Sequence, residues 1–170
     1  NEAETARVLK DGWLHTGDIG EFDENGRIRI TDRKKDIIVN DKGENISPQK
    51  IEGMLTLQPE IIQAMVSGDK RPHLVALVVP DPEWAAEWAV ANDIKYDLKA
   101  LSDLPAFRSA VMEAVDRVNR QVTLTEKVRN ITLTPDGFTI DNEMLTPSLK
   151  IRRHMIRQVY GEQIDALYRG

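Results

Sequence analysis

The 170-residue chain has no cysteine, only three histidines and no long apolar run. Without cysteine it can form neither disulfides nor thiolate metal sites, and His15, His73 and His154 lack the spacing of zinc ligands. The longest apolar run, residues 74–79, has the length of a strand and is too short for a membrane span. A formal net charge of −5 does not favour nucleic acid binding. We expect a soluble, cytoplasmic protein with no nucleic acid partner.

A tight turn followed by an alternating strand is the first clear pattern. Asn25-Gly26 is a strong hairpin signal because both residues tolerate positive φ at little cost. Residues 27–30 then alternate basic and apolar side chains, which places Ile28 and Ile30 on one face. The pattern predicts a half-buried strand.

A run of five charged residues, Asp32–Asp36, separates two apolar stretches at residues 28–30 and 37–39. Burying unpaired charges costs several kcal/mol each, so this run does not belong to a core. It is either a solvated joint between strands or a site for an anion.

A helix is expected to begin at Ser47, with Ser47 as N-cap and Pro48 in the first helical position. Ile46 and Ile51 are placed to form a hydrophobic staple across this start. The helix should end before Pro59, with an apolar stripe formed by Ile51, Met54, Leu55 and Leu57.

The remaining pattern predicts an α+β fold. Residues 61–67 and 73–79 should form an antiparallel pair, with 74–79 as a central strand covered on both sides, and residues 128–133 a further strand. Because strands and helices are mixed, we expect a small mixed or antiparallel sheet of about three to four strands flanked by helices and preceded by a β-hairpin.

Three further helices are expected, at residues 81–91, at 104–122 and after Lys150. Ser102 or Asp103 should cap the second, and Gly161 should bend or interrupt the third. Trp84 and Trp88 lie four residues apart, a helical spacing that favours packing over a ligand platform.

Four motifs give the chain a family resemblance. Thr16–Asp18 (TGD), Gly26–Asp36 (GRIRITDRKKD) and Gly43–Glu52 (GENISPQKIE) resemble, in this order, the hinge region of the AMP-forming acyl-CoA synthetases of the adenylate-forming superfamily. Residues 137–153 (GFTIDNEMLTPSLKIRR) resemble the C-terminal catalytic-lysine block in its long-chain form, where other branches carry Ser-Gly-Lys. These motifs belong to the C-terminal third of such enzymes, so the chain, which opens at Asn1, is expected to be part of a longer protein.

The resemblance implies nucleotide-binding roles for Asp18 and Arg33. The matching aspartate accepts hydrogen bonds from both ribose hydroxyls of ATP, which suits a carboxylate because it can take two donors at once. The matching arginine also holds the ribose through the fixed donors of its guanidinium group. Without the resemblance, Asp18 would be interpreted as a turn residue and Arg33 as solvated surface.

Lys35 matches the residue at which the small C-terminal domain of these enzymes rotates between an adenylating and a thioester-forming pose. Gly43, Glu44 and Asn45 match a loop that faces the active site during the thiol step, where Gly43 would let the backbone approach the pantetheine arm of CoA. Lys42 stands where the family often has a further glycine.

Lys150 matches the catalytic lysine. The resemblance implies that its ammonium group reaches between the substrate carboxylate and the α-phosphate of ATP and neutralises charge as the carboxylate attacks phosphorus. On an isolated domain we expect Lys150 to be exposed. Arg152 and Arg153 could steer phosphate groups, or they could simply be solvated residues at a helix start.

The resemblance also implies a domain division and a reaction. Residues 1–34 would close the large N-terminal domain of the parent enzyme, and residues 35–170 would form its mobile C-terminal domain. The parent would be a long-chain fatty acid–CoA ligase that makes acyl-AMP and pyrophosphate from a fatty acid and ATP, and then passes the acyl group to CoA. Mg²⁺, the adenine and the fatty acid would be bound by the missing N-terminal domain, so the fragment should hold no metal and be inactive alone.

Two other functions stay open. The enzyme could pass the acyl group to the phosphopantetheine of a carrier protein, or the chain could be a non-catalytic interaction module with the same fold. The expected partners of the chain are its own N-terminal domain and, in the whole enzyme, fatty acid, ATP and CoA. Peripheral membrane contact of the parent and dimerisation of the fragment through residues 1–34 are further expectations.

Overall fold

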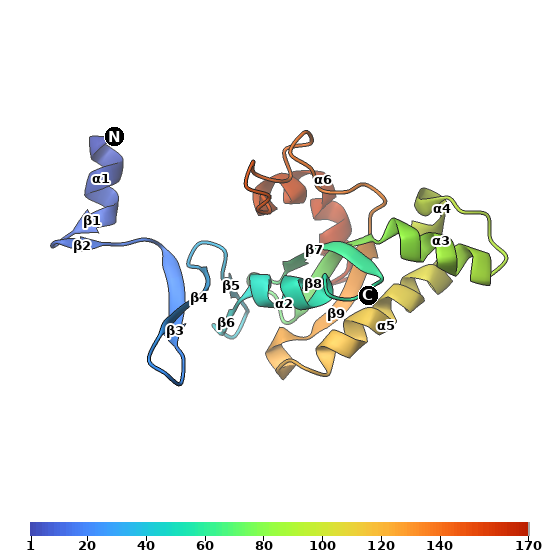
Figure 1. Cartoon of the computed structure of the whole chain (residues 1–170), viewed down its shortest axis with the longest axis horizontal. Coiled ribbons are helices and arrows are strands. Elements are labelled where there is room, and N and C mark those ends of the chain that lie inside the picture. Colours follow the sequence, from blue (N-terminus) through green and yellow to red (C-terminus); the bar gives the residue numbers. More distant parts are fainter. Residues whose placement is uncertain (170) are drawn as a thin grey trace.

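The computed structural model describes residues 1–169, and its centre is a three-stranded mixed sheet (Figure 1). β7 (Ile61–Ser67) pairs antiparallel with β8 (Leu74–Pro80), which pairs parallel with β9 (Val128–Leu133). Helices pack against this sheet, so the predicted α+β class is confirmed.

Strand β8 separates two apolar clusters, because its side chains point alternately to opposite faces of the sheet. One cluster joins β8 to four helices, α2 (Pro48–Leu55), α3 (Pro82–Ala91), α4 (Leu98–Ser102) and α5 (Pro105–Asn119). The other joins it to α6 (Arg153–Ala166). Residues 74–79 are at most 3% exposed, so the prediction of a central strand covered on both sides is confirmed.

Helix α2 begins as predicted. Ser47 is the N-cap and accepts a hydrogen bond from the Lys50 N–H, and the expected staple residues Ile46 and Ile51 are both buried. The helix ends at Leu55, however, and Leu57 is 82% exposed, so its place in the apolar stripe was predicted wrongly. The chain leaves the helix at Thr56 and points Leu57 into solvent.

Two short helices precede and follow α5: α4 (Leu98–Ser102) and the 3₁₀ turn η1 (Leu124–Glu126). Asp97 caps α4, and Ser102 ends it. Helix α5 starts after Leu104 with no side-chain cap, so the prediction that Ser102 or Asp103 caps it is wrong. Ser102 instead forms the last residue of α4, a helix that the sequence did not predict.

The last helix, α6, runs without interruption through Gly161, so the predicted alternative of an interruption there is wrong. Glycine costs about 1 kcal/mol in a helix, and the burial of Ile156, Tyr160 and Ile164 on either side of Gly161 outweighs that cost. Trp84 and Trp88 lie 5.4 and 5.1 Å from the Phe107 ring, which confirms their packing role.

The N-terminal segment extends away from the three-stranded sheet (Figure 1). It comprises α1 (Glu2–Val8), the short pair β1 (Leu9–Lys10) and β2 (Trp13–Leu14), and the hairpin of β3 (Asp18–Phe22) and β4 (Ile28–Arg33). Ile28 and Ile30 are 69% and 60% exposed, so the half-buried strand was predicted wrongly. Within the described residues, these two side chains keep most of their surface exposed, although Asp32 further along the same face is buried against Ser47.

The hairpin turn lies at Asn25-Gly26, as predicted, but it is Asp23 that stabilises it through hydrogen bonds. Its carboxylate accepts hydrogen bonds from the backbone N–H groups of Asn25 and Arg27. Only Gly26 has positive φ (+74°), so Asn25 is not in the left-handed conformation that the dipeptide suggested.

The short pair β5 (Ile38–Val39) and β6 (Asn45–Ile46) connects this segment to α2. Among the described residues, every helix is too short or too polar to cross a bilayer.

The end of α2 gives a test of the packing. Replacing Leu55, which is fully buried, with alanine should lower the free energy of unfolding by about 2–5 kcal/mol, because it leaves a cavity. The matched Leu57→Ala change should alter it by no more than about 0.5 kcal/mol. Urea denaturation of the 170-residue chain measures both, and equal losses would contradict the described end of the helix.

Candidate functional site

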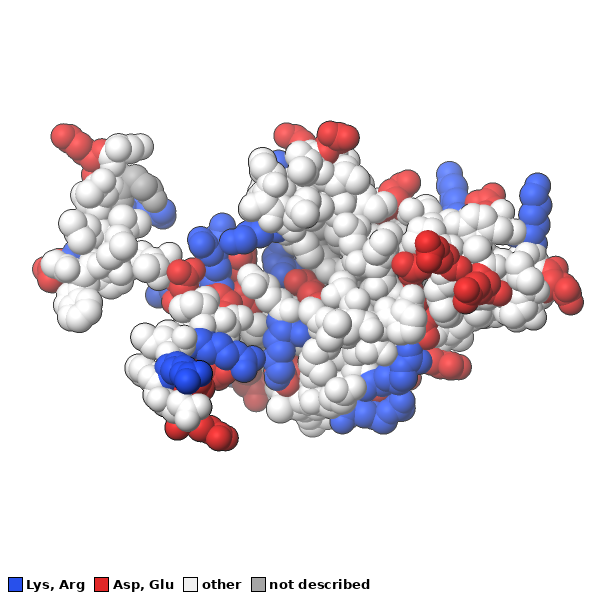
Figure 2. All heavy atoms as spheres, viewed as in Figure 1, with Lys and Arg blue, Asp and Glu red and all other residues white. Residues whose placement is uncertain are grey.

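An open cavity of about 930 Å³ lies where the N-terminal hairpin meets the body of the protein. Asp18, Arg33, Lys35 and Lys150 all line it, although they come from distant parts of the chain. Figure 2 shows basic side chains gathered around the hollow between the N-terminal segment and the body. The structure therefore brings together the predicted nucleotide-binding, hinge and catalytic residues.

Asp18 and Arg33 are direct cross-strand partners in the β3–β4 hairpin. This register places the Asp18 Oδ1 atom 3.2 Å from the Arg33 Nε atom. The Asp18 N–H also bonds to the side-chain oxygen of Thr16, which stabilises the turn before β3. Because both charged side chains remain partly exposed, each can still bind a ligand that enters the cavity.

The charged run after β4 is only partly solvated. Lys34 and Lys35 are exposed, and Lys35 lies in a turn outside any strand. The turn is closed by two hydrogen bonds from the Asp36 and Ile37 N–H groups to the Arg33 carbonyl. Asp32 is only 2% exposed, so the expectation that the whole run stays out of the interior is wrong. Its carboxylate accepts hydrogen bonds from the Ser47 hydroxyl and the Arg33 N–H.

Lys150 lies at the end of a tight hairpin formed by its own motif. The Thr146 N–H bonds to the Lys150 carbonyl at 2.9 Å, and the Lys150 N–H bonds back to the Thr146 side-chain oxygen at 3.0 Å. Leu145 and Ile151 form a bridge at the base, and Leu149 at the tip has φ +59°. The hairpin leaves Lys150 exposed at the cavity edge.

Arg153 and the buried Glu52 form a partly buried ion pair that the sequence analysis did not predict. Arg153 donates two hydrogen bonds to the Glu52 carboxylate, at 2.6 and 2.7 Å, and a third to the Val66 carbonyl. Glu52 also accepts the Val66 N–H at 2.7 Å. Together the two side chains satisfy the outward N–H and C=O groups of Val66 on the edge strand β7.

Burial raises the pKa of the Glu52 carboxyl above its ordinary value, and the neighbouring Arg153 opposes that rise. Arg153 is thus neither a free phosphate-steering residue nor a solvated one, the two roles considered from sequence. Arg152 is different, because its guanidinium lies 3.8 Å from the largely exposed Glu143 carboxylate.

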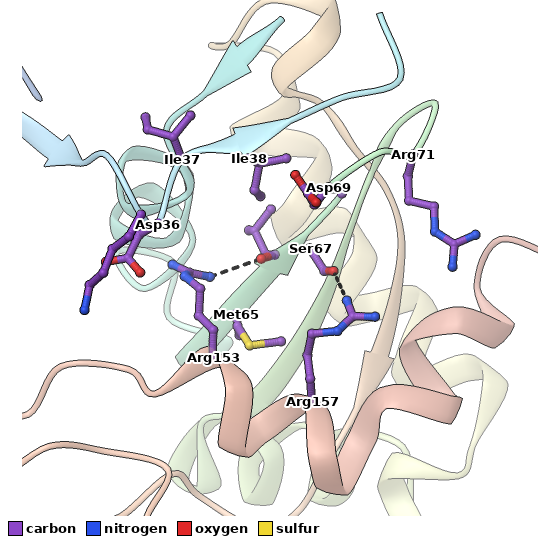
Figure 3. A pocket seen from close by; sticks show the side chains of 12 residues that line it. Asp36, Ile37, Ile38, Met65, Ser67, Asp69, Arg71, Arg153 and Arg157 are labelled. Carbon is purple, nitrogen blue, oxygen red and sulfur yellow. Dashed lines mark hydrogen bonds between the residues drawn. The ribbon is translucent and has the colours of Figure 1, made fainter. Parts of the chain in front are cut away.

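A second cavity, of about 480 Å³, shares Lys35, Asp36 and Arg153 with the first, so the turn that holds Lys35 borders both. Figure 3 shows this second cavity, with Arg153 and Arg157 pointing from α6 toward β7. Arg157 donates to the Ser67 hydroxyl at 2.7 Å, and Arg71 and Arg157 both contact Asp165.

Tyr168 contacts both ends of the connection between β7 and β8. Its hydroxyl donates to the Ser67 and His73 carbonyls, and the Arg71 guanidinium lies 4.8 Å from its ring centre. Burial raises the pKa of Tyr168 to about 12, so the hydroxyl remains a donor at neutral pH.

The predicted thiol-step residues lie elsewhere. Gly43, with φ +80°, and Glu44 and Asn45 line neither cavity. Their loop closes around the buried Asn40 side chain, whose oxygen accepts hydrogen bonds from the Lys42 and Glu44 N–H groups. In this arrangement the loop is separate from Lys150.

Among the side chains that the structure describes, no group of three or more histidine, aspartate or glutamate residues is placed to hold a metal ion.

Comparison with known proteins gives a consistent result. The model of the AMP-binding enzyme C-terminal domain family matches residues 35–170. The chain is 40% identical to long-chain fatty acid–CoA ligase 1 of Homo sapiens over 98% of its length, and 39% identical to the peroxisomal long chain acyl-CoA synthetase 7 of Arabidopsis thaliana over 99%. It spans about a quarter of the length of these curated relatives, 24% and 25%.

Solved structures with the same fold include adenylation domains of carboxylate reductases. The domain from Mycobacterium chelonae matches 99% of this chain and 25% of its own, with TM-score 0.84 and 25% identity. The domain from Segniliparus rugosus, in complex with AMP and a carboxylic acid, matches 98% of this chain and 25% of its own, with TM-score 0.82 and 27% identity.

The two neighbouring arginines before and at the start of α6 should differ sharply in importance. Replacing Arg153 with alanine leaves the buried Glu52 carboxylate without its partner and should lower the free energy of unfolding by about 3–5 kcal/mol. The matched Arg152→Ala change removes a partly exposed pair and should cost about 1 kcal/mol or less. Thermal or urea unfolding distinguishes them, and a mild effect at Arg153 would show that the pair is not essential.

Proposed function

The chain belongs to the family of AMP-binding enzyme C-terminal domains, and we propose that it is the C-terminal part of an AMP-forming long-chain fatty acid–CoA ligase. In the first half-reaction a fatty acid carboxylate oxygen attacks the α-phosphorus of ATP, and pyrophosphate leaves. In the second, the sulfur of CoA attacks the acyl carbon, and AMP leaves. The observation that carries the proposal is the convergence of Asp18, Arg33 and Lys150 on one cavity.

Asp18 and Arg33 would bind the nucleotide. A carboxylate can accept hydrogen bonds from two adjacent ribose hydroxyls, and the neighbouring guanidinium both orients that carboxylate and offers further donors. Because an exposed ion pair contributes little to stability, the two side chains can adjust to a ligand at little cost.

Lys150 would stabilise the charge that develops during adenylation. Its ammonium group is a flexible point charge at the tip of a hairpin whose backbone is held by Thr146. Placed between the attacking carboxylate and the α-phosphate, it would reduce the repulsion between two anions. Its exposure leaves it free to enter a site that the rest of the enzyme completes.

Lys35 would be the hinge. Its turn joins residues 1–34, as the end of the large domain, to residues 35–170, as the mobile domain. An exposed turn flanked by two cavities has room to change its backbone angles. Rotation there would remove Lys150 from the nucleotide and bring the loop of Gly43, Glu44 and Asn45 to the thiol, which explains why the two sets lie apart in one pose.

The rest of the parent would supply what this chain lacks. Phe22, Ile28 and Ile30 expose apolar surface on the β3–β4 hairpin, as expected of a segment that packs against a larger domain. Magnesium and most of the contacts to ATP and the fatty acid would lie in that domain.

A second candidate acceptor is a carrier protein. One solved relative in fold, 28% identical with TM-score 0.81, is the adenylation and carrier didomain of the Segniliparus rugosus carboxylic acid reductase. The higher identity to long-chain fatty acid–CoA ligases favours free CoA. Supplying the parent's acyl-adenylate with either CoA or a phosphopantetheine-bearing carrier protein would identify the acceptor.

Replacing Lys150 with alanine in the full-length parent should slow adenylation by about a hundredfold to a thousandfold, as for removal of other groups that stabilise transition-state charge. Thiolysis of supplied acyl-adenylate should be largely preserved, since Lys150 acts only in the first step. ATP–pyrophosphate exchange and thioester formation measure the two. The exposed Lys99 on α4 provides the control for loss of a positive charge, and an equal loss in both half-reactions would contradict the assigned role.

The 170-residue chain alone should show no measurable ATP–pyrophosphate exchange, because most of the nucleotide and acyl site is absent from it. The measurement uses purified chain, ATP, fatty acid and labelled pyrophosphate, with the full-length parent as positive control. Exchange by the isolated chain would overturn the division of labour proposed here.

A further inference from the structure

Asp32 is a buried carboxylate without a cationic partner. It is 2% exposed, and none of the ion pairs between described residues includes it. Its carboxylate is held by the Ser47 hydroxyl at 2.6 Å and by the Arg33 N–H at 2.7 Å. Burying a carboxylate without a cation costs free energy, so packing alone does not explain why Asp32 occupies this position.

The hydrogen bond from Ser47 to Asp32 spans the turn that contains Lys35. Asp32 lies in β4 before that turn, and Ser47 lies after it, at the start of α2. The Ser47 hydroxyl has one proton, and it is directed to Asp32. As the N-cap of α2, its oxygen accepts only a long hydrogen bond, of 3.4 Å, from the Lys50 N–H. The stronger hydrogen bond of the Ser47 hydroxyl is therefore the one to Asp32, across the turn.

Glu52, one turn further along α2, opposes this contact. It is also buried, and the negative charge of Asp32 contributes to the raised pKa of its carboxyl, after burial itself. The two buried carboxylates repel each other, and of the two only Glu52 forms an ion pair, with Arg153. The short hydrogen bond to Ser47 holds Asp32 in place against that repulsion.

We infer that the Asp32–Ser47 hydrogen bond is a latch that holds residues 1–34 and 35–170 in the pose in which Lys150 shares a cavity with Asp18 and Arg33. Asp32 and Ser47 are then positioning residues for adenylation, and neither touches the reacting atoms. The inference deepens the proposed function and rests on it for the meaning of the pose.

A series of contacts connects the Asp32–Ser47 hydrogen bond to Lys150. Ser47 begins α2, α2 carries Glu52, Glu52 holds Arg153, and Arg153 lies three residues after Lys150. Rotation at Lys35 would separate Asp32 from Ser47 and expose the carboxylate to water, which removes its burial cost. The hydrogen bond lost on opening and the hydration gained oppose each other, so the latch can open readily.

The first test measures the pose without any catalysis. The chain has no cysteine, so two spin labels can be attached through cysteines introduced at Asn25, in the hairpin turn, and Glu87, on α3, both exposed. Wild type and Ser47→Thr, which keeps the hydroxyl, should give one narrow distance distribution. Asp32→Ala and Ser47→Asp should give a broad or second distribution.

Ser47→Asp is the decisive variant because aspartate is as good an N-cap as serine. It keeps α2 capped while placing a negative charge against Asp32. A second label pair within the body, at Glu87 and Gln158, serves as control and should not change. If Ser47→Asp leaves the Asn25–Glu87 distribution as in wild type, or alters the body pair equally, the latch is refuted.

The second test uses the full-length parent. Ser47→Asp should slow ATP–pyrophosphate exchange by about tenfold to a hundredfold, the effect expected when a hydrogen bond to a charged group is lost. Thiolysis of supplied acyl-adenylate should be unchanged or faster. Equal slowing of both half-reactions would indicate a merely structural role and would overturn the inference. A parent that does not adenylate at all would refute the proposed function instead, while the label distances still decide the latch.

Discussion

The bidentate contact between Arg153 and Glu52 joins three parts of the molecule that the chain separates widely. Glu52 belongs to α2, which follows the turn that contains Lys35, and Arg153 begins α6, shortly after the lysine hairpin. Both bond to Val66, at the edge of the central sheet. These contacts, partly or fully buried, tie the lysine hairpin, α2 and the central sheet to one another.

The N-terminal segment is organised by a different constraint. Its strands satisfy their backbone groups by pairing with each other, yet they bury little apolar surface within the described residues. It therefore has defined local geometry, such as the Asp18–Arg33 pair, without a core of its own. A segment of this kind takes its position from the larger body on which it rests, and here a turn at Lys35 joins it to the rest of the chain.

Local sequence patterns predicted most of the fold. The apolar run of β8, the Ser47-Pro48 helix start and the packing tryptophans were assigned correctly, because each depends on neighbours in sequence. The family resemblance, drawn from four motifs, is confirmed, and it supplied Asp18, Arg33 and Lys150 as candidates that then met in one cavity. The spacing of residues in the sequence alone gives no reason to expect Asp18, Arg33 and Lys150 in one cavity.

The errors share a cause, which is that burial depends on distant partners. Asp32 looked like solvated charge, but Ser47 buries it. Ile28 and Ile30 looked half-buried, but no partner covers them within the described chain. Arg153 could not be told from Arg152 by sequence, since only the fold brings Glu52 beside one of them. Asp23 could have been found, because aspartate two residues before Asn-Gly is a common start for a side-chain-stabilised turn.

The tip of the lysine hairpin has a leucine, Leu149, with φ +59°. A left-handed leucine costs about 1–2 kcal/mol relative to its relaxed conformation. Glycine would avoid that strain, but it would also let the tip sample many more shapes. Leucine leaves the backbone fewer conformations than glycine would, so the adjoining Lys150 would lose less conformational freedom on entering a nucleotide site, as proposed. The backbone strain at Leu149 would thus be offset by a smaller loss of conformational entropy when Lys150 binds.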